Sequence, residues 1–83
     1  MKGGLKIDLE AIFNINKYTN YLLCLFDIDL TNNYYFKSFL NALIIEFFKI
    51  GVNKTYLSDL EPKELKKELL KINEIYFKQL LRA

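Results

Sequence analysis

The stretch from Tyr34 to Gly51, YYFKSFLNALIIEFFKIG, constrains the fold of this chain more than any other segment. On a helical wheel at about 100° per residue, its main apolar positions fall within one arc of roughly 140°, which is typical of a helix that packs on a core. That arc consists of Phe36, Phe39, Leu40, Leu43, Ile44, Phe47 and Ile50. A second apolar group, Tyr34, Ile45 and Phe48, lies on the opposite side. The pattern therefore predicts a helix that needs cover on two sides, from this chain or from a partner.

Two further segments have helical periodicity. The first helix is expected over about residues 8–27, where Asp8 has the carboxylate that suits a helix N-cap. The last helix is expected over about residues 62–81, because proline is favourable at the first helical position. Their apolar stripes are Ile12, Ile15, Thr19, Leu22, Leu23 and Phe26 in the first helix and Leu65, Leu69, Ile72, Tyr76 and Leu80 in the last.

The residues between these segments predict where the helices end. Gly51 suits the left-handed position that follows a helix, so the middle helix should span about residues 31–50, with Asp29 or Thr31 as its cap. No stretch has the alternating pattern of a β-hairpin. We therefore predict an all-α fold, a small helical bundle of three long helices with a short helical turn near 54–60. We expect residues 1–83 to form a single helical domain with residues 1–6 frayed.

The composition argues against several classes of function. The chain has no histidine and one cysteine, Cys24, so the usual general base and the usual zinc ligands are missing. Asp27 and Asp29 could hold Mg²⁺, but capping and turn roles account for both residues. A helical chain of 83 residues seldom encloses a catalytic pocket. We expect no enzyme activity, no metal, no cofactor and no small-molecule substrate.

The sequence also indicates where the protein works. A lone cysteine cannot form an intramolecular disulfide, so the fold does not depend on an oxidising compartment. The first ten residues lack the apolar run of a signal peptide, and Lys37, Asn41, Glu46 and Lys49 interrupt the middle helix. These features predict a soluble cytoplasmic protein with no membrane partner. The net charge of +2 is too small to attract nucleic acid without sequence preference.

One short segment resembles a known family. Residues 51–61, GVNKTYLSDLE, resemble the turn and recognition helix of the Cro and phage-repressor helix-turn-helix family. The resemblance implies a set of side chains that face the major groove of DNA or its phosphates. That set is Asn53, Lys54, Thr55, Tyr56 and Ser58. A small helix-turn-helix-like DNA-binding regulator is therefore the alternative function.

The leading hypothesis comes from apolar side chains that lie outside the predicted core-facing stripes. Tyr18 and Tyr21 on the first helix, with Tyr34, Ile45 and Phe48 on the middle one, are side chains of the kind that anchor helix-mediated interfaces. They predict a non-enzymatic helical protein-interaction module, either a homodimer or a small subunit, adaptor or inhibitor of a larger protein. The partner is then another protein or a second copy of this chain. The other interpretation is that the first and last helices cover both sides of the middle one.

Overall fold

A computed structural model describes residues 8–31 and 34–82 of the chain. Within them it contains three α-helices, α1 (Leu9–Asp27), α2 (Tyr34–Lys49) and α3 (Pro62–Arg82), and one short 3-10 helix, η1 (Thr55–Asp59). The described residues include no strand. The predicted all-α bundle and its helical turn are confirmed, with each helix end within three residues of the prediction. The predicted fraying of residues 1–6 concerns a segment outside the described residues.

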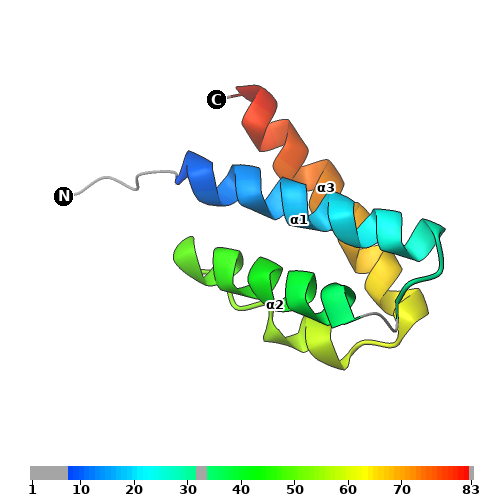
Figure 1. The fold of residues 1–83 in the computed structure, drawn as a ribbon. Coiled ribbons are helices and arrows are strands. Elements are labelled where there is room, and N and C mark those ends of the chain that lie inside the picture. Colours follow the sequence, from blue (N-terminus) through cyan, green and yellow to red (C-terminus); the bar gives the residue numbers. More distant parts are fainter. Residues whose placement is uncertain (1–7, 32–33, 83) are drawn as a thin grey trace.

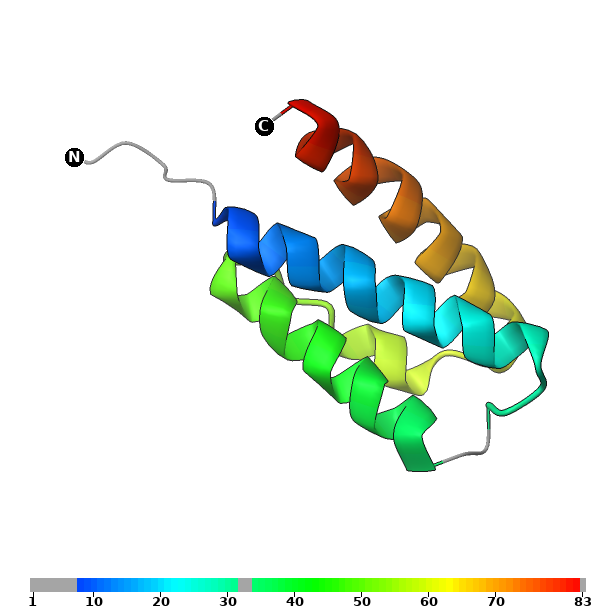
Figure 2. The same ribbon diagram turned by 45° about the horizontal axis from the view of Figure 1, so that its top comes forward.

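The helix with neighbours on both sides is α1. Figures 1 and 2 show α2 along one side of α1 and α3 crossing it obliquely on the other, and both helices pack against it. The 3-10 helix η1 lies against α2. Because α2 packs on α1 and η1, it forms an outer edge of the bundle in Figure 2. Its second apolar side therefore receives no cover from α1 or α3.

The core lies where the three predicted stripes meet. Residues of all three α-helices contribute, and so does Leu57 of η1. The cluster of buried side chains consists of Ile15, Leu22, Phe36, Leu40, Leu43, Ile44, Phe47, Leu57, Leu65, Leu69 and Ile72. Burying such side chains contributes about 1.5–3 kcal/mol each, which makes this cluster the main source of stability.

The residues predicted to begin or end helices, Asp8, Gly51 and Pro62, have those roles in the structure. The Asp8 carboxylate accepts a hydrogen bond from the Ala11 amide at 3.0 Å, which satisfies a free N–H of the first turn of α1. Gly51 has φ +77°, and the Val52 amide donates to the Phe47 carbonyl at 2.9 Å, as in a Schellman motif. Pro62 is the first residue of α3. The local sequence therefore determines where these helices begin and end.

The role of Asp29 differs from the predicted one. Asp29 does not cap the following helix; it has φ +57° and occupies the left-handed position after α1. The Leu30 amide donates to the Leu25 carbonyl at 2.8 Å, and the Asp29 amide donates to the Phe26 carbonyl at 3.2 Å, which is a second Schellman motif. A carboxylate at the negative end of a helix, with no basic residue in the last turn, is electrostatically unfavourable.

We expect Asp29→Gly to stabilise the protein by about 1 kcal/mol. Relief of the left-handed backbone strain stabilises the folded protein by about 1–2 kcal/mol. The greater freedom of glycine in the unfolded chain costs about 0.5–1 kcal/mol. Removal of the unfavourable charge adds a few tenths of a kcal/mol. Urea unfolding followed by circular dichroism measures the change. Asp29→Asn separates the charge from the backbone effect, and Gly51→Ala should destabilise by about 1 kcal/mol through the same strain. A loss of stability in Asp29→Gly would contradict this account.

Candidate interaction surface

The second apolar group of the middle helix lies exposed on the edge of the bundle. Tyr34 is 79% exposed, Ile45 is 56% exposed and Phe48 is 51% exposed. By contrast, Phe47, the residue before Phe48, is fully buried. Ser38 and Asn41 are exposed between them. We call this surface the α2 outer face, defined by Tyr34, Ser38, Asn41, Ile45 and Phe48. It faces away from α1 because the opposite arc of α2 is anchored in the core.

The apolar residues of the α2 outer face are spread along the helix. Ile45 and Phe48 are one turn apart and adjacent. Tyr34 lies eleven residues before Ile45, about 16 Å along the helix axis, and its ring meets Tyr35 edge-on at 5.9 Å. Asn41 lies between the two apolar ends. The face is therefore a long strip with apolar ends and a polar centre.

The structure places Tyr18 and Tyr21 on a different surface. Both rings tilt against Phe39, with centroids 6.1 Å and 5.1 Å from it, at the junction of α1 and α2. Tyr18 is half-buried and packs against the core, whereas Tyr21 remains 45% exposed. The five predicted partner-binding residues thus divide between the α2 outer face and the α1–α2 junction.

A buried carboxylate lies on the same helix, near that junction. Glu46 is 6% exposed. Its Oε1 accepts a hydrogen bond from Asn14 Nδ2 of α1 at 3.3 Å, and its Oε2 pairs with Lys49 Nζ at 2.9 Å. The hydrogen bond to Glu46 raises the pKa of the Lys49 ammonium above its usual value, and the charges of Glu46, Glu10 and Asp8 act in the same direction. These contacts compensate Glu46 for its lost hydration.

This cluster predicts a pH dependence at the alkaline end. Because the pKa of Lys49 is higher in the folded than in the unfolded protein, the stabilisation is fully present below the ordinary lysine pKa of 10.5 and is lost as the pH rises through the folded value. Thermal unfolding between about pH 10 and 12 should show a larger decrease in Tm for the natural protein than for Lys49→Arg, because arginine keeps its charge. Parallel curves for the two proteins would contradict this.

The segment that resembles a helix-turn-helix forms η1 and its flanks. Thr55–Asp59 is a 3-10 helix of five residues, and no recognition helix follows Gly51 before α3. The Asn53 side chain accepts hydrogen bonds from the Thr55 amide at 3.0 Å and the Thr55 hydroxyl at 2.7 Å. The Ser58 hydroxyl donates to the Thr55 carbonyl at 2.9 Å. These polar side chains hold the turn in shape.

The remaining two residues of that segment connect it to α3. Lys54 Nζ donates to the Tyr56 hydroxyl at 3.3 Å, and this hydroxyl donates to Glu68 Oε2 at 3.2 Å. Lys54 Nζ also lies 5.8 Å from the centre of the Phe47 ring, within cation–π range. Glu68 would repel a nucleic-acid backbone that approached this cluster. The geometry gives no support to groove binding by Asn53, Lys54, Thr55, Tyr56 or Ser58.

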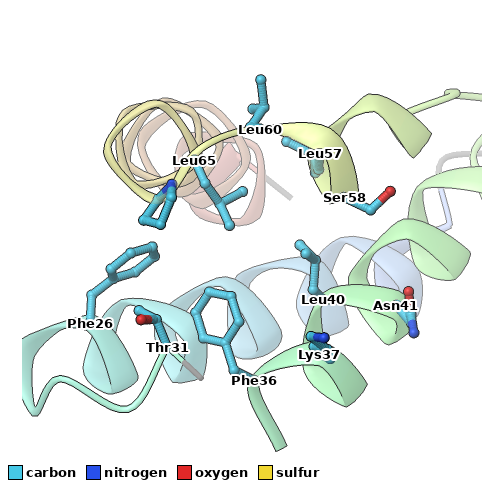
Figure 3. Close-up of a pocket in the computed structure, with 11 residues that line it drawn as sticks. Phe26, Thr31, Phe36, Lys37, Leu40, Asn41, Leu57, Ser58, Leu60 and Leu65 are labelled. Atoms are coloured by element: carbon cyan, nitrogen blue, oxygen red, sulfur yellow. The ribbon is translucent and has the colours of Figure 1, made fainter. Parts of the chain in front are cut away.

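A pocket of about 340 Å³ opens beside the α2 outer face. In Figure 3, Phe26, Phe36 and Leu40 form one side of this pocket, and Leu57 and Leu65 form the other. Lys37 and Asn41 of α2 are among its polar lining residues, with Thr31 and Ser58. The pocket therefore borders the α2 outer face at Asn41.

The comparison with known proteins gives no identification. No family model, curated protein or solved structure matches this chain.

The structure also exposes Phe13, which no predicted stripe included, and Phe77, which periodicity places alongside the main apolar stripe of the last helix. Phe13 of α1 is 57% exposed and Phe77 of α3 is 50% exposed, and both line a shallow depression with Asn16 and Asn20. Their positions lie at the borders of the apolar stripes, so periodicity alone does not show on which side the neighbouring helix passes.

No cluster of three or more His, Cys, Asp or Glu suited to a metal occurs among the described residues. In this same part of the chain, no helix has the length and apolarity needed to cross a membrane.

Proposed function

We propose that this protein is a non-enzymatic helical interaction module that binds a protein partner through the α2 outer face. The supporting observation is the exposure of Tyr34, Ile45 and Phe48 on one side of a helix whose other side is anchored in the core. Apolar area removed from water contributes about 25 cal/mol per Å², so covering these side chains favours association. Ile45 and Phe48 form an adjacent exposed pair on this face, and aromatic side chains are enriched at protein interfaces.

The composition supports a binding role over catalysis. Without histidine, and with one cysteine, the chain lacks the groups that most often serve as general base, nucleophile partner or zinc ligand. The partner would be a larger protein, for which this chain is a small subunit, adaptor or inhibitor, or a second copy of the chain. A fold that needs no disulfide is compatible with work in the cytoplasm. No observation favours the DNA-binding alternative.

We expect the double variant Ile45→Ser and Phe48→Ser to bind a partner at least about tenfold more weakly, because buried apolar anchors commonly contribute more than 1.4 kcal/mol to binding. The fold should persist, since both side chains are already half-exposed. A pull-down from lysate of the source cells with quantitative mass spectrometry measures the loss for heterologous partners. Analytical ultracentrifugation measures it for self-association.

The matched control is Phe13→Ser, which removes another exposed aromatic side chain from a different surface. Proteins that the natural chain and Phe13→Ser retain, and that the double variant loses, support the proposal. Equal recovery by all three proteins, together with identical sedimentation, would reject the α2 outer face as the binding surface.

A further inference from the structure

We propose that the α2 outer face binds the same face of a second copy of this chain, with the two α2 helices antiparallel and Asn41 on the two-fold axis. This inference rests on the proposed function, because it names the partner of the same surface. In Figure 2, α2 lies along an outer edge of the bundle, and its exposed side chains there are the ones that a second α2 helix would cover.

The spacing along α2 is self-complementary. Tyr34 precedes Asn41 by seven residues, and Phe48 follows Asn41 by seven residues. Seven residues are close to two helical turns, so the three side chains follow one line along the helix at steps of about 10 Å. A two-fold axis through Asn41 therefore brings Tyr34 of each copy to the partner's Phe48. An interface between identical patches requires this kind of symmetry.

The centre of the strip has a side chain that can pair with itself. Asn41 is exposed, and within the described residues no hydrogen bond engages its amide. A carboxamide is both donor and acceptor, so two Asn41 side chains across a two-fold axis can form two reciprocal hydrogen bonds. A polar asparagine among apolar positions of a helix pair fixes the alignment of the two helices.

The charges on α2 favour the antiparallel arrangement. Lys37 and Lys49 are exposed beside the strip, and a parallel pair would bring each lysine next to its own copy. In the antiparallel pair the two Lys37 residues are eight residues apart, about 12 Å along the axis, and each lies at the axial level of the partner's Ile45. The aliphatic part of a lysine can cover such an apolar side chain. Antiparallel helices also align their dipoles favourably.

The available area fits a weak dimer. Taking about 150–250 Å² for an aromatic side chain, Tyr34, Phe48 and Ile45 expose roughly 350 Å² per copy. With their polar neighbours the two copies would bury about 1,000 Å² in total, which is the lower limit for a specific interface. We therefore expect a Kd of about 10–100 μM.

Sedimentation equilibrium of the natural protein between about 5 μM and 1 mM should show a reversible monomer–dimer equilibrium. Asn41→Asp places two carboxylates on the axis and should weaken the dimer at least about tenfold at pH 7. The control is Asn20→Asp, which makes the same charge change at an exposed position of α1 and should leave the dimer unchanged. Equal association by the two variants would overturn the placement of Asn41.

Cysteine trapping tests the direction of the helices. The exposed Cys24 is first replaced in Cys24→Ser, and Tyr34→Cys and Phe48→Cys are then introduced into separate chains. For an antiparallel pair, neither the Tyr34→Cys protein nor the Phe48→Cys protein should form a disulfide with itself, but a mixture of the two should form one. The Asn41→Cys protein should form a disulfide with a second copy of itself. Self-linked Phe48→Cys dimers would show a parallel pair and overturn the proposal.

The two proposals fail in different ways. A protein that remains monomeric up to about 1 mM and traps no disulfide excludes self-pairing. If the Ile45→Ser and Phe48→Ser double variant nevertheless loses a captured protein, the α2 outer face binds a different partner and the proposed function stands. If neither association nor capture depends on these residues, both proposals are wrong.

Discussion

Replacing Phe47 with alanine should lower the free energy of unfolding by about 3–5 kcal/mol, because the truncation removes a fully buried ring and leaves a cavity. The Phe47 ring meets Tyr76 of α3 edge-on at 5.3 Å, and Lys54 approaches it from the η1 side. One side chain thus joins α2, α3 and the segment between them. In a domain of 83 residues, whose total stability is a few kcal/mol, the variant should be largely unfolded at 37 °C.

The neighbouring phenylalanine provides a matched control. Phe48 has the same side chain on the same helix but is 51% exposed, so Phe48→Ala should cost less than about 1 kcal/mol. Urea unfolding followed by far-UV circular dichroism compares the two variants. Similar losses in both would mean that α2 is rotated from the orientation described, with Phe48 sharing the core.

The second large effect is expected at Leu57, the fully buried residue of η1. Leu57→Ala should destabilise the protein by about 2–5 kcal/mol, because this side chain fills the space between α2 and the start of α3 and lines the pocket beside it. The turn that resembles a recognition helix therefore has a structural role in the core. Thermal and urea unfolding measure the loss.

Two exposed neighbours of Leu57 serve as controls. Tyr56→Ala removes the exposed hydrogen bond to Glu68, and Ser58→Ala removes one to the Thr55 carbonyl, so each should cost no more than about 1 kcal/mol. A gel-shift titration with Tyr56→Ala and the natural protein examines the DNA-binding alternative at the same time. If Leu57→Ala leaves the stability unchanged and Tyr56→Ala lowers the affinity for DNA, our interpretation of this segment is wrong.

Much of the fold could be predicted because its signals are local. Asp8, Gly51 and Pro62 act within one turn of their own helix, so their roles depend on backbone geometry that the sequence already specifies. The apolar stripes likewise follow from the helical period. Asp29 was harder to predict, since its left-handed conformation at the end of α1 is uncommon for a residue other than glycine.

The candidate site was predicted in part. Periodicity separated Tyr34, Ile45 and Phe48 from the core arc of α2, and all three are exposed. It did not separate Tyr18 and Tyr21 from that group, because their place at the α1–α2 junction depends on where Phe39 of the next helix lies. The burial of Glu46 also depends on a contact across helices, with Asn14 of α1.

The sequence by itself determined the helices, their ends and the arc that each one buries, because these follow from interactions among residues close together in the chain. Only the tertiary structure decided that α1, rather than the strongly apolar α2, lies between its neighbours. A helical stripe specifies which face is buried but not which helix covers it, since apolar burial is non-directional. That choice leaves Ile45 and Phe48 at the surface, where a partner can cover them.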